Sequence, residues 1–401
     1  MHLVQYIQLP ETGGWLWVLR QVGIGTPCLT LEKFEMKKSL IALAVLAASG
    51  AAMAQSSVTL YGIADVWVGS IDVDTGVAAS SRKSTQMVSG GVSTSRWGMK
   101  GSEDLGGGLK ANFQLESTVN LDTGTGAAVA GFDRQAWVGV SGGFGAVKLG
   151  RSTTAYEEAQ LRSVAMFDSD LSPVNGFSLT QATGASLSGA SGVFRSVRHA
   201  TRADNQIHYQ APNMGGFSGA VSYSLDEKVT TALPALGAQP TATSGKAVTA
   251  FNLTYNGGPI GAELAYQQEV SNGTIPAGRT DDVSYLRVGA SYNFGVATAK
   301  VQYGKVDNVS NFANAETTEY AIGIDVPLSS VMTVAAGYAY SEDNATAGNE
   351  ERSGYGVAVA YSLSKRTTVY GGVKLMEYKG TTTLGASADV TAYAVGVKHA
   401  F

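Results

Sequence analysis

Charged side chains that share one face of extended segments are the feature of this sequence with the clearest chemical meaning. In the segment 96–100, Arg96 and Lys100 share one face of an extended chain, while Trp97 and Met99 share the other. The segment 110–116 alternates in the same way and puts Glu116 on its polar face. Fixed charges of both signs beside water set ion preference rather than perform a reaction.

The residues that support catalysis or metal binding do not come together in the sequence. The single cysteine, Cys28, lies near the N-terminus. Beyond residue 54 the histidines are His199, His208 and His399, and none forms a pair with metal-ligand spacing. No Gly-x-Ser-x-Gly elbow, which needs a turn from a strand into a helix, is indicated. We therefore expect no cofactor, no metal site and no enzymatic activity.

The N-terminal region predicts export. Met36-Lys-Lys-Ser is a short basic stretch, residues 40–48 are an apolar run, and Ala52-Met-Ala54 is a small-x-small cleavage site. Residues 36–54 are thus interpreted as a signal peptide and 55–401 as the mature chain. Residues 1–35 are interpreted as a mis-called N-terminal extension; a membrane-anchoring leader is the alternative.

Composition restricts the class of the mature protein. The chain of 401 residues carries 28 Lys and Arg against 32 Asp and Glu, a net charge of −4, which gives no reason to expect nucleic acid as a partner. After residue 54 no apolar stretch approaches the roughly 20 residues of a transmembrane helix. The remaining classes are a soluble periplasmic protein and an outer-membrane β protein.

Strand-like segments recur from Val58 to the end, and 50 glycines argue against a helical protein. The predicted strands number sixteen: 58–70, 86–101, 109–121, 132–141, 145–152, 204–211, 217–226, 246–256, 260–270, 282–294, 296–306, 317–327, 330–341, 352–363, 366–378 and 389–401. Short and long connections alternate between them, as at the periplasmic and extracellular rims of an outer-membrane barrel. We therefore predict an all-β, 16-stranded antiparallel transmembrane β-barrel.

Two further features favour a membrane barrel over a soluble sheet. The last strand alternates Tyr393, Val395 and Val397 with small or charged residues and ends on an aromatic, Phe401, which is expected of a strand that pairs with the first one. The polar strand faces must also be enclosed, because the chain has no other core. A wide barrel with an aqueous lumen satisfies both demands.

The segment 153–203 is much longer than the other connections. Loops of this length are uncommon unless they are functional or disordered. It carries acidic residues first, including Asp168 and Asp170, and then basic ones, including Arg198 and Arg202. An external surface loop is one interpretation; we expect instead a constriction loop folded into the lumen.

Long stretches of the mature chain resemble the general diffusion porins of Gram-negative bacteria, of the beta-proteobacterial type. The matching stretches are 57–65, 95–111, 113–116, 134–140, 144–151, 361–370 and Phe401. The resemblance implies a homotrimer of 16-stranded barrels in outer-membrane lipid and lipopolysaccharide, each with its own pore. The resemblance also implies that the protein is exported and located in the outer membrane.

The resemblance further implies the residues of the constriction. Strand parity leaves the side of Arg134 ambiguous, because Arg134 shares a face with Ala136 and the apolar Val138; the resemblance places it inward. The expected basic wall is then Arg96, Lys100 and Arg134, joined by Arg198 or Arg202. The expected acidic side is Glu116, Asp168 and Asp170.

These expectations together predict passive diffusion of ions and small hydrophilic solutes with a modest preference for anions. Two alternatives stay open, namely an outer-membrane adhesin or structural barrel and a barrel hydrolase with an exposed Ser–His arrangement. Conductance in a planar bilayer distinguishes them, because only a porin opens large current steps.

Overall fold

The structure is a computed structural model of the chain, which divides into two units, Met1–Ala54 and Gln55–Phe401. The residues it describes are 57–76, 81–126, 131–159, 166, 169–175, 193–194, 196–225, 229–231, 241–243, 246–271, 278–344, 350–380 and 387–401. The predicted extension 1–35 and signal peptide 36–54 lie outside these residues and stay predictions.

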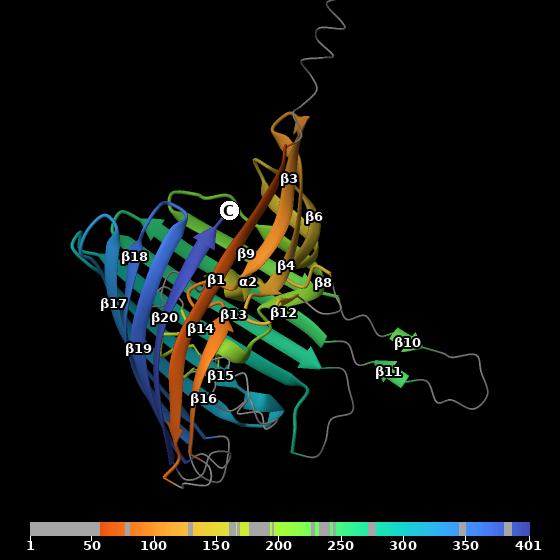
Figure 1. Cartoon of the computed structure of the whole chain (residues 1–401). Coiled ribbons are helices and arrows are strands. Elements are labelled where there is room, and N and C mark those ends of the chain that lie inside the picture. Colours follow the sequence, from red (N-terminus) through yellow and green to blue (C-terminus); the bar gives the residue numbers. More distant parts are fainter. Residues whose placement is uncertain are drawn as a thin grey trace, which may run out of the picture. The chain divides into compact units, whose positions relative to one another are not determined.

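Sixteen antiparallel strands of the described residues form one closed β-barrel (Figure 1). Two segments, β2 and β3, count as one barrel strand because both pair with β1. In chain order the barrel contains β1 (Ser57–Asp74), β2 (Arg82–Ser89) with β3 (Arg96–Gly106), β4 (Leu109–Asn120), β6 (Gln135–Gly142), β7 (Gly145–Thr153), β8 (Arg202–Gln210), β9 (Phe217–Ser224), β12 (Lys246–Gly257), β13 (Ile260–Ser271), β14 (Asp282–Asn293), β15 (Thr298–Asp307), β16 (Glu316–Pro327), β17 (Met332–Asp343), β18 (Glu350–Ser362), β19 (Thr367–Lys379) and β20 (Ser387–Ala400).

Small elements occupy the connections between barrel strands. The short strand β5 (Thr125–Gly126) pairs with the end of β4, and β10 (Val229–Thr231) pairs with β11 (Thr241–Thr243) as a separate hairpin. The helical turns are α2 (Ala155–Ala159), η3 (Ser196–Arg198) and η4 (Val309–Asn311). Among the described residues, no helix is both long and apolar enough to cross a membrane.

The barrel is closed by pairing between its first and last strands, as the terminal alternation predicts. β1 pairs antiparallel with β20 from Ile63 opposite Ala400 to Asp74 opposite Asp389. Figure 1 shows the red-orange β1 beside the blue β20. The backbone N–H of Phe401 donates to the Gly62 carbonyl at 3.0 Å, and the N–H of Gly62 donates back at 3.1 Å. Closure therefore extends to the final residue.

The two faces of each strand differ in the sense expected of a barrel in lipid. In β12, Phe251 and Leu253 are 41% and 50% exposed on the outer face. Asn252 and Thr254, which alternate with them, are 8% and 3% exposed on the inner face. Large apolar groups outside and polar groups inside reverse the pattern of a soluble protein, and this reversal is what a bilayer requires.

Fifteen of the predicted strands correspond to single barrel strands with end points that differ by a few residues. The predicted segment 86–101 is the exception, because it is broken into β2 and β3 by the irregular stretch 90–95. That break depends on a residue of another strand.

The carboxylate of Asp65 holds this break in place. Backbone N–H groups of residues 91–93 donate to it at 3.2, 3.0 and 2.7 Å, and Tyr370 Oη donates at 2.5 Å. The Ser95 hydroxyl adds a bond to the Asp65 carbonyl at 2.7 Å. Asp65 is fully buried, so these donors replace the water that a carboxylate otherwise needs.

The described parts of the segment 153–203 are attached to several distant strands. The N–H of Ser196 donates to Glu319 Oε1 of β16 at 2.9 Å, and Ser341 Oγ of β17 donates to the Val193 carbonyl at 2.5 Å. Lys374 Nζ of β19 donates to the carbonyls of Ser172 and Asn175 at 3.1 and 2.7 Å. The segment is thus bonded to consecutive parts of the wall between β16 and β19.

Replacing Asp65 with alanine is expected to destabilise the barrel. The substitution leaves the Tyr370 hydroxyl and three backbone N–H groups, one buried and two part-buried, without their acceptor. The expected cost is about 3 kcal/mol in the free energy of unfolding. Urea unfolding followed by tryptophan fluorescence measures it.

Asp72→Ala is the matched control on the same strand, because Asp72 pairs with Lys83 at 3.5 Å where both side chains are well exposed. Such surface pairs contribute less than about 1 kcal/mol. Equal shifts for the two variants would contradict the role given to Asp65.

Candidate functional site

Adjacent strands bring the charged residues of the sequence pattern to one part of the inner wall. Arg96 lies opposite Ile63 of β1 on one side and Thr118 of β4 on the other. Glu116 lies opposite Gly98. Because directly opposed residues share a face, Arg96 and Glu116 both face inward. Lys100, two alternations beyond Arg96 on β3, faces the same way, so the predicted shared face is observed.

The Glu116 carboxylate is the centre of this group. Its Oε1 accepts from Arg134 Nε at 2.6 Å, and its Oε2 accepts from Tyr61 Oη at 2.9 Å. Arg96 Nε lies 3.8 Å from Oε2. We call Arg96, Lys100, Glu116, Arg134 and Tyr61 the charged cluster.

Lys100 joins the charged cluster through Tyr61. Its Nζ lies 5.3 Å from the centroid of the Tyr61 ring, within the range of a cation–π contact. Gln114 Nε2 donates to Tyr61 Oη at 2.6 Å. The Glu116 carboxylate therefore lies within ion-pair distance of two guanidinium groups, and Tyr61 links it to a third cation, Lys100. Three cations and one carboxylate give the cluster a net positive charge.

Gly98 makes room for this arrangement. A Cβ at Gly98 would lie 2.9 Å from Tyr61 Oη and 2.5 Å from the Leu115 carbonyl oxygen. Real Cβ atoms do not approach other atoms so closely. The absence of a side chain lets Tyr61 pass across β3 to reach Glu116.

Arg134 faces inward, although strict alternation would put it on the outward face that Ala136 and Val138 share. β6 begins at Gln135, so Arg134 precedes the regular strand and is free of its alternation. Its N–H donates to the Glu116 carbonyl at 3.1 Å while its Nε donates to the carboxylate. The inward position that the family resemblance implies is therefore observed.

Glu116 does not lie across a gap from the arginines, where the sequence analysis put it. It is within the basic group, 7% exposed, beside Arg134 at 9% and Arg96 at 26% exposure of their side chains. The guanidinium groups of Arg96 and Arg134 repel each other, and a carboxylate within ion-pair distance of both offsets this repulsion, which explains the position.

Arg202 extends the charged cluster along β8. It lies opposite Thr153 of β7, and Thr153 accepts a hydrogen bond from Gln135 Nε2 at 2.7 Å. Its charge interacts with Arg134, Glu116 and Glu157. The backbone of Arg198 lies in η3, but its side chain is outside the described residues.

Glu157 on α2 offsets some of this positive charge. Its Oε2 is 3.1 Å from His199 Nε2. Burial alone would raise the pKa of Glu157, but the His199 hydrogen bond and the charges of Arg287 and Arg202 outweigh burial and hold the pKa below its ordinary value. Glu157 is thus favoured as the anion.

The two expected acidic residues of the long segment have different outcomes. Asp168 lies outside the described residues. Asp170 accepts from Trp67 Nε1 at 3.3 Å, and its N–H donates to the Gly91 carbonyl at 2.8 Å. Its charge interacts with Lys374. Asp170 thus lies against β1 and β19, and its place on the acidic side of a constriction stays a prediction.

Sequence reasoning missed a second ion pair on the inner wall. Arg287 of β14 donates to Glu263 Oε1 of β13 at 3.1 Å, with both side chains almost fully buried. Its guanidinium lies 4.1 Å from the centroid of the Tyr156 ring. A signal was available, because Arg287 alternates with the outward residues Leu286 and Val288.

Two other missed carboxylates bind the long segment itself. Glu269 Oε1 accepts from the N–H of Ala200 at 2.5 Å, and Glu319 accepts from Ser196. Both carboxylates thus satisfy backbone donors of the long segment.

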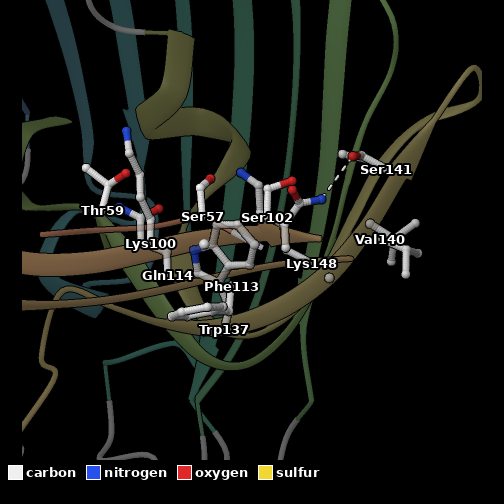
Figure 2. A pocket seen from close by; sticks show the side chains of 15 residues that line it. Ser57, Thr59, Lys100, Ser102, Phe113, Gln114, Trp137, Val140, Ser141 and Lys148 are labelled. Carbon is white, nitrogen blue, oxygen red and sulfur yellow. Dashed lines mark hydrogen bonds between the residues drawn. The ribbon is translucent and has the colours of Figure 1, made fainter. Parts of the chain in front are cut away.

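A hollow of about 390 Å³ lies beside the charged cluster, toward the short turns. Figure 2 shows Thr59, Lys100, Gln114, Trp137 and Lys148 around it, from β1, β3, β4, β6 and β7. Within the described ranges no group of three or more His, Cys, Asp or Glu residues could hold a metal ion.

A family model described as Gram-negative porin matches residues 40–381. The chain belongs to this family. It is 37% identical over 382 residues to outer membrane porin protein 32 of Delftia acidovorans, covering 91% of this chain and 100% of that protein. It is 30% identical over 407 residues to an outer membrane porin protein of Bordetella pertussis, with the same coverages.

A solved structure agrees with the fold of this porin. The anion-selective porin from Comamonas acidovorans superposes with a TM-score of 0.67 and 30% identity, and the match covers 86% of this chain and 100% of that one. The porin is therefore an outer-membrane protein whose barrel forms a water-filled channel. The charged cluster lies on the inner wall of that channel.

Glu116→Gln is expected to raise the ratio of anion to cation permeability of this porin about twofold to threefold. One unit charge at about 7 Å in water changes the free energy of an ion by about 0.6 kcal/mol without salt and by about 0.25 kcal/mol after screening at physiological salt. The effect has opposite signs for an anion and a cation, so the permeability ratio changes by about 0.5 kcal/mol. The reversal potential under a salt gradient in a planar bilayer measures the ratio.

Glu351→Gln is the matched control, since Glu351 is exposed near the end of β18. An unchanged reversal potential for Glu116→Gln, or an equal change for Glu351→Gln, would show that Glu116 does not act on permeating ions.

Proposed function

We propose that this porin conducts ions and small hydrophilic solutes by passive diffusion with a modest preference for anions. The observation that carries the proposal is the net positive charge of the charged cluster, in which one carboxylate lies within ion-pair distance of Arg96 and Arg134 while Lys100 has no carboxylate partner among the described residues. The description of the Comamonas acidovorans porin as anion-selective is consistent with it.

The overall acidity of the chain does not argue against this preference. At physiological salt, charges more than about 8 Å away from an ion are largely screened. Carboxylates on distant loops therefore act weakly on an ion that passes Arg96 and Lys100. Several inner-wall carboxylates are also withdrawn from water, among them Glu263 and Glu269, which are at most 3% exposed.

We infer that the segment 153–203 narrows the lumen beside the charged cluster. Its described parts bond to inward-facing residues of distant strands, such as Glu269 of β13, Glu319 of β16 and Lys374 of β19. Inward-facing groups on opposite parts of a closed wall can be reached together only from inside. A narrowed pore would bring solutes close enough to the cluster for its field to act.

Replacing Arg96 and Arg134 together with glutamine is expected to lower the anion-to-cation permeability ratio about fivefold, since two charges act near the permeating ion. The reversal potential of purified protein in a planar bilayer measures it. Large unitary currents in the same experiment test channel function against the adhesin and hydrolase alternatives.

Lys365→Gln together with Arg366→Gln serves as the charge-matched control, because Lys365 and Arg366 are both exposed in the short turn between β18 and β19. A cation-selective wild type, or a double variant with the wild-type ratio, would refute the proposed anion preference. A closed barrel without current steps would refute channel function itself.

We also propose that the porin assembles as a homotrimer. Outward positions of β1 hold modest side chains at Leu60, Gly62 and Ala64. An apolar hollow of about 640 Å³ lies on the outer face of β1 and β18–β20, where Gly371 presents no side chain. Small outward groups favour close packing of one barrel wall against another.

A trimer predicts three times the mass of one barrel in native mass spectrometry from mild detergent. Gly371→Trp should fill the outer hollow and shift the population toward single barrels, while Leu363→Trp, at an exposed position of a short turn, should not. A single-barrel mass for the wild type would contradict the assembly.

A further inference from the structure

The hollow beside the charged cluster has a composition that the diffusion of simple ions does not require. It lies between the ends of β3 and β6 and the starts of β1, β4 and β7. Its lining combines lysines, hydroxyl and amide groups with the aromatic side chain of Trp137. Figure 2 shows the Lys100, Gln114 and Trp137 side chains gathered in it.

The two lysines of the hollow have different electrostatic partners. Lys148 Nζ is 3.1 Å from Glu158 Oε1 and 5.6 Å from the centroid of Trp137. Lys100 has no carboxylate within ion-pair distance in the described part of the chain; it contacts the Tyr61 ring instead. The Lys100 side chain is also exposed. Its ammonium is therefore the group that an incoming anion meets.

The aromatic side chain presents ring surface rather than a hydrogen-bond donor. Trp137 Nε1 donates to Gln135 Oε1 at 3.0 Å, so the indole N–H is occupied. Its ring is half-buried, and part of it lines the hollow. What it offers a solute is a flat apolar face close to a cation.

The hollow shares Lys100 with the charged cluster but lies apart from Glu116 along the pore. Gln114 lines the hollow, and Glu116 lies two residues further along β4, a step of about 7 Å. The short turns 143–144 and 107–108 follow the strand ends that form the hollow. A solute would therefore occupy it on the short-turn side of the cluster.

We propose that the hollow is a subsite for small organic anions with a flat aromatic body. This inference rests on the proposed channel function and names a solute class for it. The carboxylate of the solute pairs with Lys100, and the ring lies on Trp137. The hydroxyls of Thr59 and Ser102, which also line the hollow, supply further donors at its edge. An aliphatic carboxylate can pair with Lys100 but has no ring to lie on Trp137.

Current block by benzoate, compared with acetate, tests the subsite in planar bilayers that hold the purified full-length porin. Benzoate should reduce the chloride current with a saturable dependence on concentration, whereas acetate at equal concentration should not. Trp137→Leu should raise the half-blocking benzoate concentration about fivefold, which is the loss of one aromatic contact of about 1 kcal/mol.

Lys100→Gln should raise the half-blocking concentration at least as much, because the ion pair is lost. Lys398→Gln is the matched control: Lys398 also faces inward, opposite Asp65, but does not line the hollow. The half-blocking benzoate concentration of the Lys398→Gln variant should equal that of the wild type.

The outcomes separate the two proposals. Two outcomes with normal unitary conductance would overturn the subsite and leave channel function intact. One is equal block of the current by acetate and benzoate; the other is benzoate block that is unchanged in Trp137→Leu and Lys100→Gln. A protein that opens no current steps would overturn both. Equal weakening of block in Lys398→Gln would show general attraction of anions rather than a subsite.

Discussion

Pairing of every backbone polar group is the constraint on which the rest of this structure depends. A bilayer offers no water to an unpaired N–H or C=O, so a sheet that crosses it must have no free edge. Here the pairing of β1 with β20 removes that edge and continues to Phe401, whose N–H and C=O both bond to Gly62. Closure then fixes which face of every strand is inside. A single-residue shift in register would turn the charged inner face toward lipid, where each charge is costly.

Closure of the barrel also brings charged side chains of adjacent strands close together on the inner wall. Arg134 is nearly buried, and a lone buried guanidinium is unstable unless a carboxylate pairs with it. Glu116 supplies that pairing and in doing so cancels part of the positive charge. The arrangement is a compromise between stability of the wall and strength of the field. Arg96, which is more exposed and 3.8 Å from Glu116, keeps more of its charge available to water.

Alternation of side chains was sufficient to predict the strands and the inward face of Arg96, Lys100 and Glu116, because both depend only on local periodicity. It could not predict the break between β2 and β3, since that break is held by Asp65 from another strand. Nor could alternation predict which way the Arg134 side chain faces, because Arg134 lies just before β6 and does not follow the alternation of that strand. The partner of Arg287 was equally beyond local reasoning. Glu263 is distant along the chain, and only the register of β13 with β14 brings the two together.

Exposure, more than the count of charged residues, decides what a solute meets in this pore. The chain has more carboxylates than cations, yet the inner-wall carboxylates Glu263, Glu269 and Glu319 are buried. Two of them bind backbone N–H groups of the segment 153–203, and Glu263 binds Arg287. Lys100 remains exposed on the same inner face. Acidic groups thus hold the segment to the wall, while a cation stays in contact with water. Net charge and local field can therefore have opposite signs in one barrel, because the buried carboxylates are paired with Arg287 or with backbone donors, whereas Lys100 faces water with no carboxylate partner among the described residues.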